Sequence, residues 1–191
     1  MNDQTWLVVG LGNPGPEYAK TRHNIGAMAI ESWAARLGWR LSRNKKAQAF
    51  TAEGRVNGAK VVLALPQTFM NLSGSPVKNL MDYYKVDPLN VIVLHDELDI
   101  PFETLRLKLG GGDNGHNGLR SIRSSTGTGD WYRVRLGIGR PPGQQDPSAF
   151  VLKAFASAEA KVLDVFCDRA ADAVETLISS GLEIAQSRYN Q

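Results

Sequence analysis

Short apolar segments alternate with segments of helical periodicity along this chain, and this alternation constrains the fold more than any other feature. Residues 6–10 and 91–94 are almost continuously apolar, as expected for strands buried on both faces of a sheet. Over residues 24–37 the apolar side chains instead recur every three or four positions, and Gly38 follows as a candidate helix C-cap. Strands that alternate with helices predict an α/β fold: a mixed, largely parallel twisted sheet flanked by helices on both faces.

A hairpin is expected to make part of this sheet antiparallel. Asn57-Gly58, a typical two-residue hairpin turn, separates the strand-like segments 47–56 and 60–65. The other expected elements are a helix ending at residue 84, helices over residues 117–125 and 157–180, and strands over residues 105–109 and 133–138. Because 191 residues suit one domain and no linker or repeat interrupts them, residues 1–191 are predicted to form a single domain.

The composition excludes several classes of protein. Hydrophobic residues make up 42% of the chain, enough for a core, and no run approaches the roughly 18 apolar residues of a membrane span. No secretory signal is visible in the first residues, and the single cysteine, Cys167, excludes an intramolecular disulfide and a multi-cysteine zinc site. We therefore expect a cytoplasmic protein with no membrane partner.

The formal net charge of +3 conceals an uneven distribution. Residues 105–140 hold seven basic and two acidic side chains, whereas residues 157–191 hold three basic and six acidic ones. A sequence pI near 9.1 with a basic segment indicates an anionic partner such as a nucleic acid. Basic side chains that simply face solvent would give the same pattern, so charge alone does not decide the function.

A glycine-rich loop at residues 10–15 matches the G-x-G-x-x-G pattern of dinucleotide-binding proteins and follows an expected strand. Pro14 lacks an N–H group for a pyrophosphate, and the next expected strand, near residues 39–41, ends without an acid for a ribose. Arg43 could instead bind a phosphate-bearing cofactor. An NADP-linked oxidoreductase is therefore one hypothesis for the function.

Histidine and aspartate residues next to expected strands and helices offer a different chemistry. His23 precedes the helix that starts near residue 24, where free N–H groups disfavour an imidazolium, so a neutral, basic imidazole is expected. A histidine that only caps or packs at the helix start is the alternative. Asp96 closes an expected strand and could orient an imidazole. A metal site at His95, Asp96 and Asp99 is disfavoured, because adjacent strand residues point to opposite faces.

A histidine acting on water is the favoured catalytic group, since G-x-S-x-G is absent and Cys167 has a core-like position. Asparagines would then serve as polarising donors, and Asn71 lies in a loop between a strand and a helix, although it could also only shape that turn. The glycine run within residues 110–118 precedes another helix. It could bind an anion or form a mobile lid.

Five segments together resemble the bacterial peptidyl-tRNA hydrolase family. They are VVGLGNPG (residues 8–15), Tyr18 with TRHNIG (21–26), PQTFMNLSG (66–74), HDELD (95–99) and GGGDNGHNGL (110–119). Their order and the chain length also agree with the family. The resemblance implies hydrolysis of the ester that joins a peptide to the 3′-end of tRNA, which recycles chains dropped by ribosomes. It further implies a monomer that acts without a metal or a cofactor.

The resemblance also implies roles for individual residues. His23 would be the base that activates water, Asp96 the carboxylate that orients it, and Asn13 would complete the catalytic set. The other implied residues are Met70, Asn71, His116 and Asn117 around the substrate, Tyr18 near the tRNA end, and Arg106, Lys108 and Arg135 on tRNA phosphate. Asparagine amides would bind the peptide main chain and the oxyanion.

One residue departs from the family pattern, because Glu103 occupies a turn where the family usually places glycine. Its carboxylate lies near the expected phosphate-binding residues in sequence, so this departure bears on tRNA binding and not on catalysis. The alternative function is a non-catalytic RNA-binding protein on the same fold. The presence of His23, Asp96, Asn13 and Asn71 together favours an active enzyme.

Overall fold

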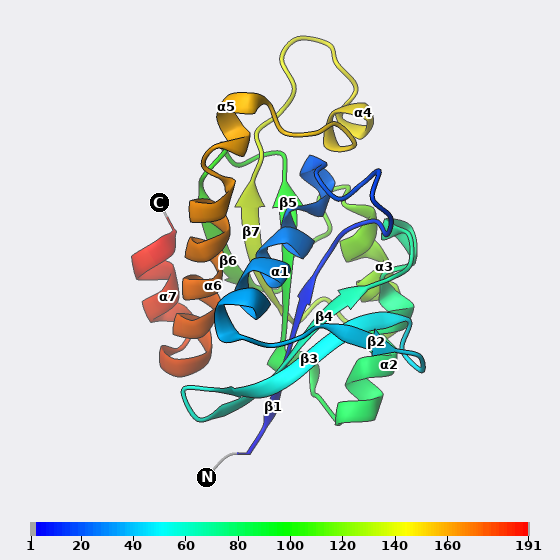
Figure 1. Cartoon of the computed structure of the whole chain (residues 1–191), viewed down its shortest axis with the longest axis vertical. Coiled ribbons are helices and arrows are strands. Elements are labelled where there is room, and N and C mark those ends of the chain that lie inside the picture. The colour runs from blue at the N-terminus through cyan, green and yellow to red at the C-terminus, as the bar shows by residue number, and fades with distance from the viewer. Residues whose placement is uncertain (1–2, 191) are drawn as a thin grey trace.

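The computed structural model describes residues 3–190, and its centre is a seven-stranded sheet in the order β2-β3-β4-β1-β5-β7-β6 (Figure 1). Strand β1 pairs in parallel with β4 and β5, and β5 pairs in parallel with β7. The outer pairs β2–β3, β3–β4 and β6–β7 are antiparallel. The strands are β1 Thr5–Gly10, β2 Ser42–Asn44, β3 Ala49–Val56, β4 Ala59–Pro66, β5 Val91–Glu97, β6 Leu105–Leu109 and β7 Tyr132–Gly137. The predicted mixed, largely parallel sheet is confirmed.

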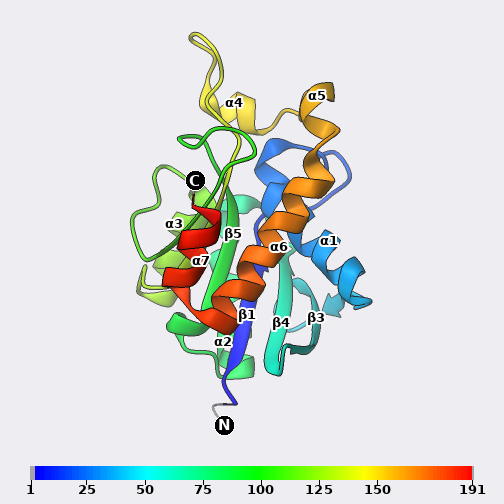
Figure 2. The same cartoon turned by 90° about the vertical axis from the view of Figure 1, so that its left-hand side faces the viewer.

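Helices cover both faces of this sheet, also as predicted (Figures 1 and 2). The α-helices are α1 Ile25–Leu37, α2 Gly74–Tyr84, α3 Asn117–Thr126, α4 Pro147–Val151, α5 Ser157–Ala160, α6 Leu163–Ser180 and α7 Leu182–Tyr189. Three 3-10 turns, η1 Arg22–Asn24, η2 Met70–Leu72 and η3 Pro88–Asn90, each lead into a following element. Within the described residues, no helix is both long and apolar enough to cross a bilayer.

The central strand β1 contributes to two hydrophobic cores, which explains its continuously apolar sequence. Val8 packs in the core beneath α1 and α6, while Leu7 and Val9 pack in the core beneath α2 and α3. All three side chains are fully buried. Because successive side chains of a strand point to opposite faces, a strand covered on both sides must be apolar throughout.

Two glycines bring the start of α1 against the ends of β1 and β5. A Cβ atom on Gly10 would lie 2.4 Å from the carbonyl oxygen of Gly26, and one on Gly26 would lie 2.2 Å from that of Leu94. Only glycine permits such a close approach between backbones. The approach places η1, which carries His23, beside the carboxyl end of β5.

The C-terminal part differs from the sequence-based expectation. The helix predicted over residues 157–180 is two helices, α5 and α6, and a further helix, α7, follows Gly181. Within α7 and just beyond it, Gln186 and Asn190 hydrogen-bond to the backbone of Leu107, so they cover the edge strand β6. The strand expected near residues 39–41 begins later, as β2. Asn57-Gly58 turns the β3–β4 hairpin as predicted.

Candidate active site

A cavity of about 460 Å³ opens at the carboxyl ends of the central strands. This is the usual position of ligand sites in open α/β sheets. The cavity is lined by side chains from η1, η2, β5, α3 and α4 and the loops beside them: Asn13, His23, Phe69, Met70, Asn71, Asp96, Glu97, Leu98, Asn114, Gly115, His116, Asn117, Pro147, Ser148, Val151 and Leu152. The predicted residues His23, Asp96, Asn13, Met70, Asn71, His116 and Asn117 therefore all line one space.

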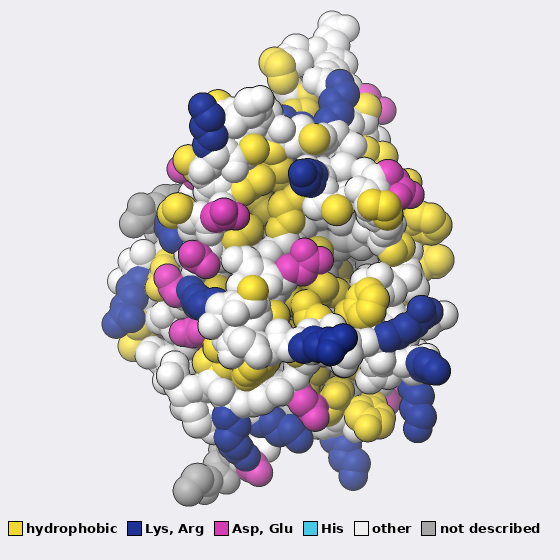
Figure 3. All heavy atoms as spheres, in the orientation of Figure 1, with side chains coloured by type: hydrophobic (Ala, Val, Ile, Leu, Met, Phe, Trp, Pro, Cys, Tyr) yellow, Lys and Arg dark blue, Asp and Glu magenta, His cyan; other side chains and the backbone are white. Residues whose placement is uncertain are grey.

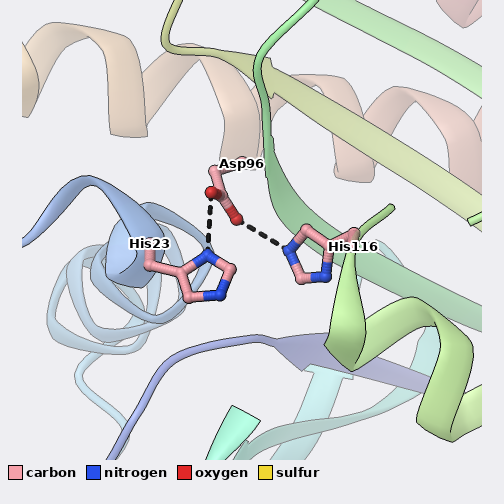
Figure 4. Close-up of side chains that lie close together, drawn as sticks. All are labelled: His23, Asp96 and His116. Carbon is pink, nitrogen blue, oxygen red and sulfur yellow. Dashed lines mark hydrogen bonds and ion pairs between the residues drawn. The ribbon is translucent and has the colours of Figure 1, made fainter. Parts of the chain in front are cut away.

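Two imidazoles share the carboxylate of Asp96 at the base of this cavity (Figure 4). Nδ1 of His23 lies 2.8 Å from Oδ2, and Nε2 of His116 lies 2.7 Å from Oδ1. Asp96 is only 4% exposed. Burial alone would raise the pKa of this carboxyl, but the two histidines and their hydrogen bonds hold it well below its usual range.

The hydrogen bonds assign a tautomer to each of the two histidines. Nδ1 of His116 caps α3 by accepting from the N–H groups of Gly118, at 3.1 Å, and Leu119, at 3.3 Å. Its proton is therefore on Nε2, which donates to Asp96. His23 donates to Asp96 from Nδ1, so its Nε2 is the nitrogen that can accept a proton from water.

The electrostatics of His23 differ from the sequence-based expectation. Burial lowers the pKa of this imidazole, but the charge of Asp96 and the hydrogen bond to it outweigh burial, so the pKa is raised. The helix start, from which a neutral imidazole was predicted, does not dominate. A raised pKa makes Nε2 a stronger base in its deprotonated form.

Asn24 orients Asn13 beside these histidines, a role that sequence analysis missed. Oδ1 of Asn24 accepts from the backbone N–H of Asn13 at 2.9 Å, and its Nδ2 donates to the carbonyl of Asn13, also at 2.9 Å. Oδ1 of Asn13 in turn accepts from the N–H of Met70 at 2.7 Å. The acceptor of the Asn13 amide is thus engaged, and its Nδ2 is the group available to donate to a ligand.

The glycine-rich loop at residues 10–15 is not built to hold a dinucleotide. The N–H groups of Leu11 and Asn13 donate within the protein, to the carbonyl of Leu94 and to Asn24 respectively. A Cβ on Gly12 would lie 2.8 Å from the Asn24 side chain. These glycines serve close packing, and the geometry offers no support for the oxidoreductase hypothesis.

The remaining cavity residues form its walls and rim. Met70 and Asn71 lie in η2, and Asn117 is the first residue of α3. Phe69, which is 55% exposed, projects at the mouth of the cavity and meets Tyr18 edge to face at 6.4 Å. Tyr18 itself does not line the cavity, and its contact with Phe69 places it beside the rim.

The predicted phosphate-binding residues lie on β6 and β7, outside the cavity lining. In the sheet register Arg106 is opposite Arg135, and Lys108 is opposite Arg133. Leu105 and Leu107 pack in the core beneath α6, so these four basic side chains start from the opposite face of the sheet.

Glu97 connects this basic face to the cavity, a link that sequence analysis did not predict. Its Oε1 accepts from Arg135 at 2.9 Å, and its Oε2 accepts from Asn114 at 3.0 Å. Glu97 and Asn114 both line the cavity. Burial, together with Arg135 and Arg133, lowers the pKa of Lys108.

The turn at Glu103 has the backbone conformation that favours glycine. Glu103 has a φ of 69°, in the left-handed region, and its carbonyl accepts from Arg169 at 3.1 Å. The family's preference for glycine at this turn therefore has a conformational reason that is independent of tRNA binding.

The one group of three potential metal ligands found within residues 3–190 is the hydrogen-bonded group itself. Across residues 3–190, the ligand atoms of His23, Asp96 and His116 lie within 4.8 Å of one another. Both carboxylate oxygens accept hydrogen bonds there, so a cation would have to displace these bonds. Of the disfavoured metal set, His95 points its Nδ1 at the backbone carbonyl of Asp96, and Asp99 pairs with Arg140.

Comparison with known proteins identifies the family. The family model described as peptidyl-tRNA hydrolase matches residues 7–191. The chain belongs to the peptidyl-tRNA hydrolase family. The peptidyl-tRNA hydrolase of Rhodococcus opacus (strain B4) is 55% identical over 190 residues and covers 100% of both chains. That of Streptomyces coelicolor is 58% identical over 190 residues, which are 97% of this chain and 94% of the other.

The fold agrees with solved structures of the same family. A crystal structure of peptidyl-tRNA hydrolase from Acinetobacter baumannii superposes with a TM-score of 0.91 at 37% sequence identity. The superposition covers 98% of this chain and 97% of the other. The resemblance inferred from the five sequence segments is therefore confirmed.

Proposed function

We propose that this protein hydrolyses the ester between peptide and tRNA in peptidyl-tRNA, releasing both for reuse. The observation that carries this proposal is the pairing of His23 Nδ1 with Asp96 at 2.8 Å, in a cavity that also holds Asn13. A base oriented by a carboxylate, next to an amide donor, is suited to attack by water on an acyl carbon. A passive RNA-binding protein has no need of this arrangement.

The reaction follows from the hydrogen bonds. Nε2 of His23 accepts a proton as water attacks the ester carbonyl, and Asp96 stabilises the imidazolium that forms. The oxyanion of the tetrahedral intermediate receives a hydrogen bond from Nδ2 of Asn13. When the C–O bond breaks, the imidazolium returns its proton to the departing ribose oxygen. General base catalysis of this kind contributes about 10²–10⁴-fold.

The cavity walls explain how peptides of any sequence could bind. Asn71 and Asn117 each carry an amide, the complement of a peptide unit, and so would bind the main chain and no side chain. In Asn117 the amide oxygen also accepts a long hydrogen bond from Arg120, at 3.4 Å, which leaves its donors for a ligand. Apolar side chains such as Val151 and Leu152 complete the wall, and its two carboxylates, Asp96 and Glu97, already accept hydrogen bonds from protein side chains. A free aminoacyl ester would instead bring its ammonium group into an amide-lined space, which is unfavourable.

Basic residues beside the cavity are suited to the tRNA backbone. Arg106, Lys108 and Arg135 share one face of β6 and β7, next to Glu97 of the cavity wall. Acidic side chains gather over α6 on the opposite face of the sheet (Figure 3). We infer that tRNA approaches over β6 and β7 rather than over α6.

A turnover assay tests the proposed function. Purified protein is incubated with N-acetyl-aminoacyl-tRNA or with the same tRNA carrying the free amino acid, each with and without EDTA. We expect rapid release from the first substrate, slow release from the second and no effect of the chelator, since we propose that neither metal nor cofactor takes part. Sedimentation of the same sample tests the proposal that the enzyme is a monomer. We also propose that the enzyme acts in the cytoplasm.

A further inference from the structure

Arg22, the neighbour of His23 in η1, is a buried cation that the mechanism above does not use. Its side chain is 9% exposed, and its guanidinium lies 4.0 Å from the ring centroid of Phe150 and 5.6 Å from that of Phe155. Nη2 pairs with Glu159 at 3.0 Å, and Nη1 donates to the carbonyl of Ala154 at 3.0 Å. A buried charge needs such partners, so the guanidinium links several separate groups.

All of these partners belong to one segment, residues 150–159, more than a hundred positions away in sequence. The backbone makes the same connection, since the N–H of Arg22 donates to the carbonyl of Lys153 at 3.0 Å and Thr21 forms a β-bridge with Ala154. Glu159 also accepts from the N–H of Ala156 at 2.9 Å, which fixes the start of α5. Arg22 thus ties α4 and α5 to the turn that carries His23.

Helix α4 is short, and the attachment to Arg22 adds to the packing of Phe150 and Val151 against the core. It is five residues long, and Phe150, its buried residue, lies directly under the Arg22 guanidinium. Figures 1 and 2 show α4 beyond the ends of β5 and β7, and α5 at the near end of α6. Yet Ser148 and Val151 of α4, and Leu152 directly after it, line the cavity that holds His23.

We infer that Arg22 is a positioning residue: it clamps the α4 wall of the cavity against the turn of His23, and so sets the space for the peptide beyond its first residue. This inference rests on the proposed function. The planar guanidinium can stack on Phe150 while two of its nitrogens reach a carbonyl and a carboxylate. A lysine ammonium offers no such fork, so Arg22→Lys should behave as a partial loss rather than as a conservative change.

The first readout is independent of catalysis. Amide hydrogen exchange is compared in wild type, Arg22→Met and Arg36→Met. Arg36 is a matched control, since its guanidinium also links two helices but its ion pairs, to Asp172 and Glu175, are with α6 rather than with α4. We expect exchange over residues 148–155 to accelerate about tenfold or more in Arg22→Met only. Unchanged exchange there, or equal acceleration in both variants, would overturn the clamp.

The second readout is substrate length. We compare kcat/KM for tRNA carrying an N-acetyl-aminoacyl group and an N-acetyl-tripeptidyl group. In Arg22→Met, kcat/KM should fall about tenfold more for the tripeptidyl substrate than for the aminoacyl one. In Arg36→Met, kcat/KM for both substrates should stay at the wild-type value. An equal fall in kcat/KM for both substrates would mean that Arg22 does not shape the part of the cavity that receives the longer peptide. If Arg22→Met fails to fold, Arg22→Lys and Glu159→Gln replace it, with the same pattern expected at smaller size. Failure of the proposed function itself would show separately, as absence of turnover in wild type.

Discussion

Among the single residues of the site, Asp96 organises the hydrogen bonding, because each of its carboxylate oxygens pairs with a different imidazole. Sequence analysis predicted the pairing with His23 but not the equal pairing with His116. Arg22 and Asn24 lie in the family-like segment 21–26, but sequence analysis assigned no role to either residue. Their partners, residues 150–159 and Asn13, are distant or lie in another loop, and nothing in local sequence indicates such contacts.

Replacing Asp96 with asparagine should slow hydrolysis by about 10²–10⁴-fold. The imidazolium that forms on His23 loses its countercharge, and the orientation of the ring is no longer fixed by a carboxylate. The pH profile should move as well. Asp96 raises the pKa of His23, so in the variant the remaining effect of burial should lower that pKa. The rising limb of the pH–rate profile should therefore shift to lower pH. A pH–rate profile in the same position as that of wild type would contradict the pairing.

His116 combines two roles that substitution can separate. His116→Ala should remove both the cap of α3 and one donor to Asp96, with about 1 kcal/mol of stability lost through the cap. Asparagine is a good cap but its side chain is too short to take over the bond to Asp96. His116→Asn should therefore recover most of the stability, measured by urea unfolding, yet remain slow in turnover. If His116→Asn recovered turnover as fully as it recovers stability, His116 would have only a structural role.

Elements of the central sheet followed from sequence more reliably than those at the C-terminus. Buried parallel strands such as β1 and β5 need continuous apolar runs, and the Asn-Gly turn predicts its hairpin directly. The break between α5 and α6 is hidden, because the apolar periodicity continues across it. Helix α7 buries little more than Ala185 and gives a weak pattern of its own.

The contact between α1 and the sheet should tolerate no added atom. Gly26→Ala places a methyl group against the carbonyl of Leu94, so we expect a loss of roughly 2–4 kcal/mol in the free energy of unfolding. The displaced helix start should also move His23 and reduce kcat. Gly112→Ala is the control, since the added carbon meets open space there, and its stability should stay within about 0.5 kcal/mol of wild type. Similar losses in both variants would refute the close-packing argument.

On the scale of the whole molecule, the basic side chains of β6 and β7 lie on the face of the sheet opposite α6, over which acidic side chains gather (Figure 3). Residues 105–140 supply the basic face, as the sequence indicated, but Arg135 is partly neutralised by Glu97. Lys108 and Arg135 should therefore differ as substitution sites. The sequence alone could not show this, because the pairing depends on the register of β5 against β7.

Lys108→Ala should raise KM, leave kcat near wild type and reduce the slope of log KM against log salt by about 1. Arg135→Ala should do the same but also lower the melting temperature, because it leaves the buried Glu97 carboxylate without its cation. Adding Glu97→Gln to Arg135→Ala should restore the melting temperature and leave KM high. A loss confined to kcat in Lys108→Ala would contradict a role in tRNA binding.

The most direct test of the account is single-turnover hydrolysis of peptidyl-tRNA by wild type and His23→Ala, over the pH range in which histidine titrates. The variant should fold and bind tRNA as wild type does. We expect the wild-type rate to rise with pH through one ionisation and then level off, and the His23→Ala rate to fall by at least about 10²-fold and lose that ionisation. A variant rate within a few-fold of wild type, or one that keeps the same ionisation, would show that His23 is not the base.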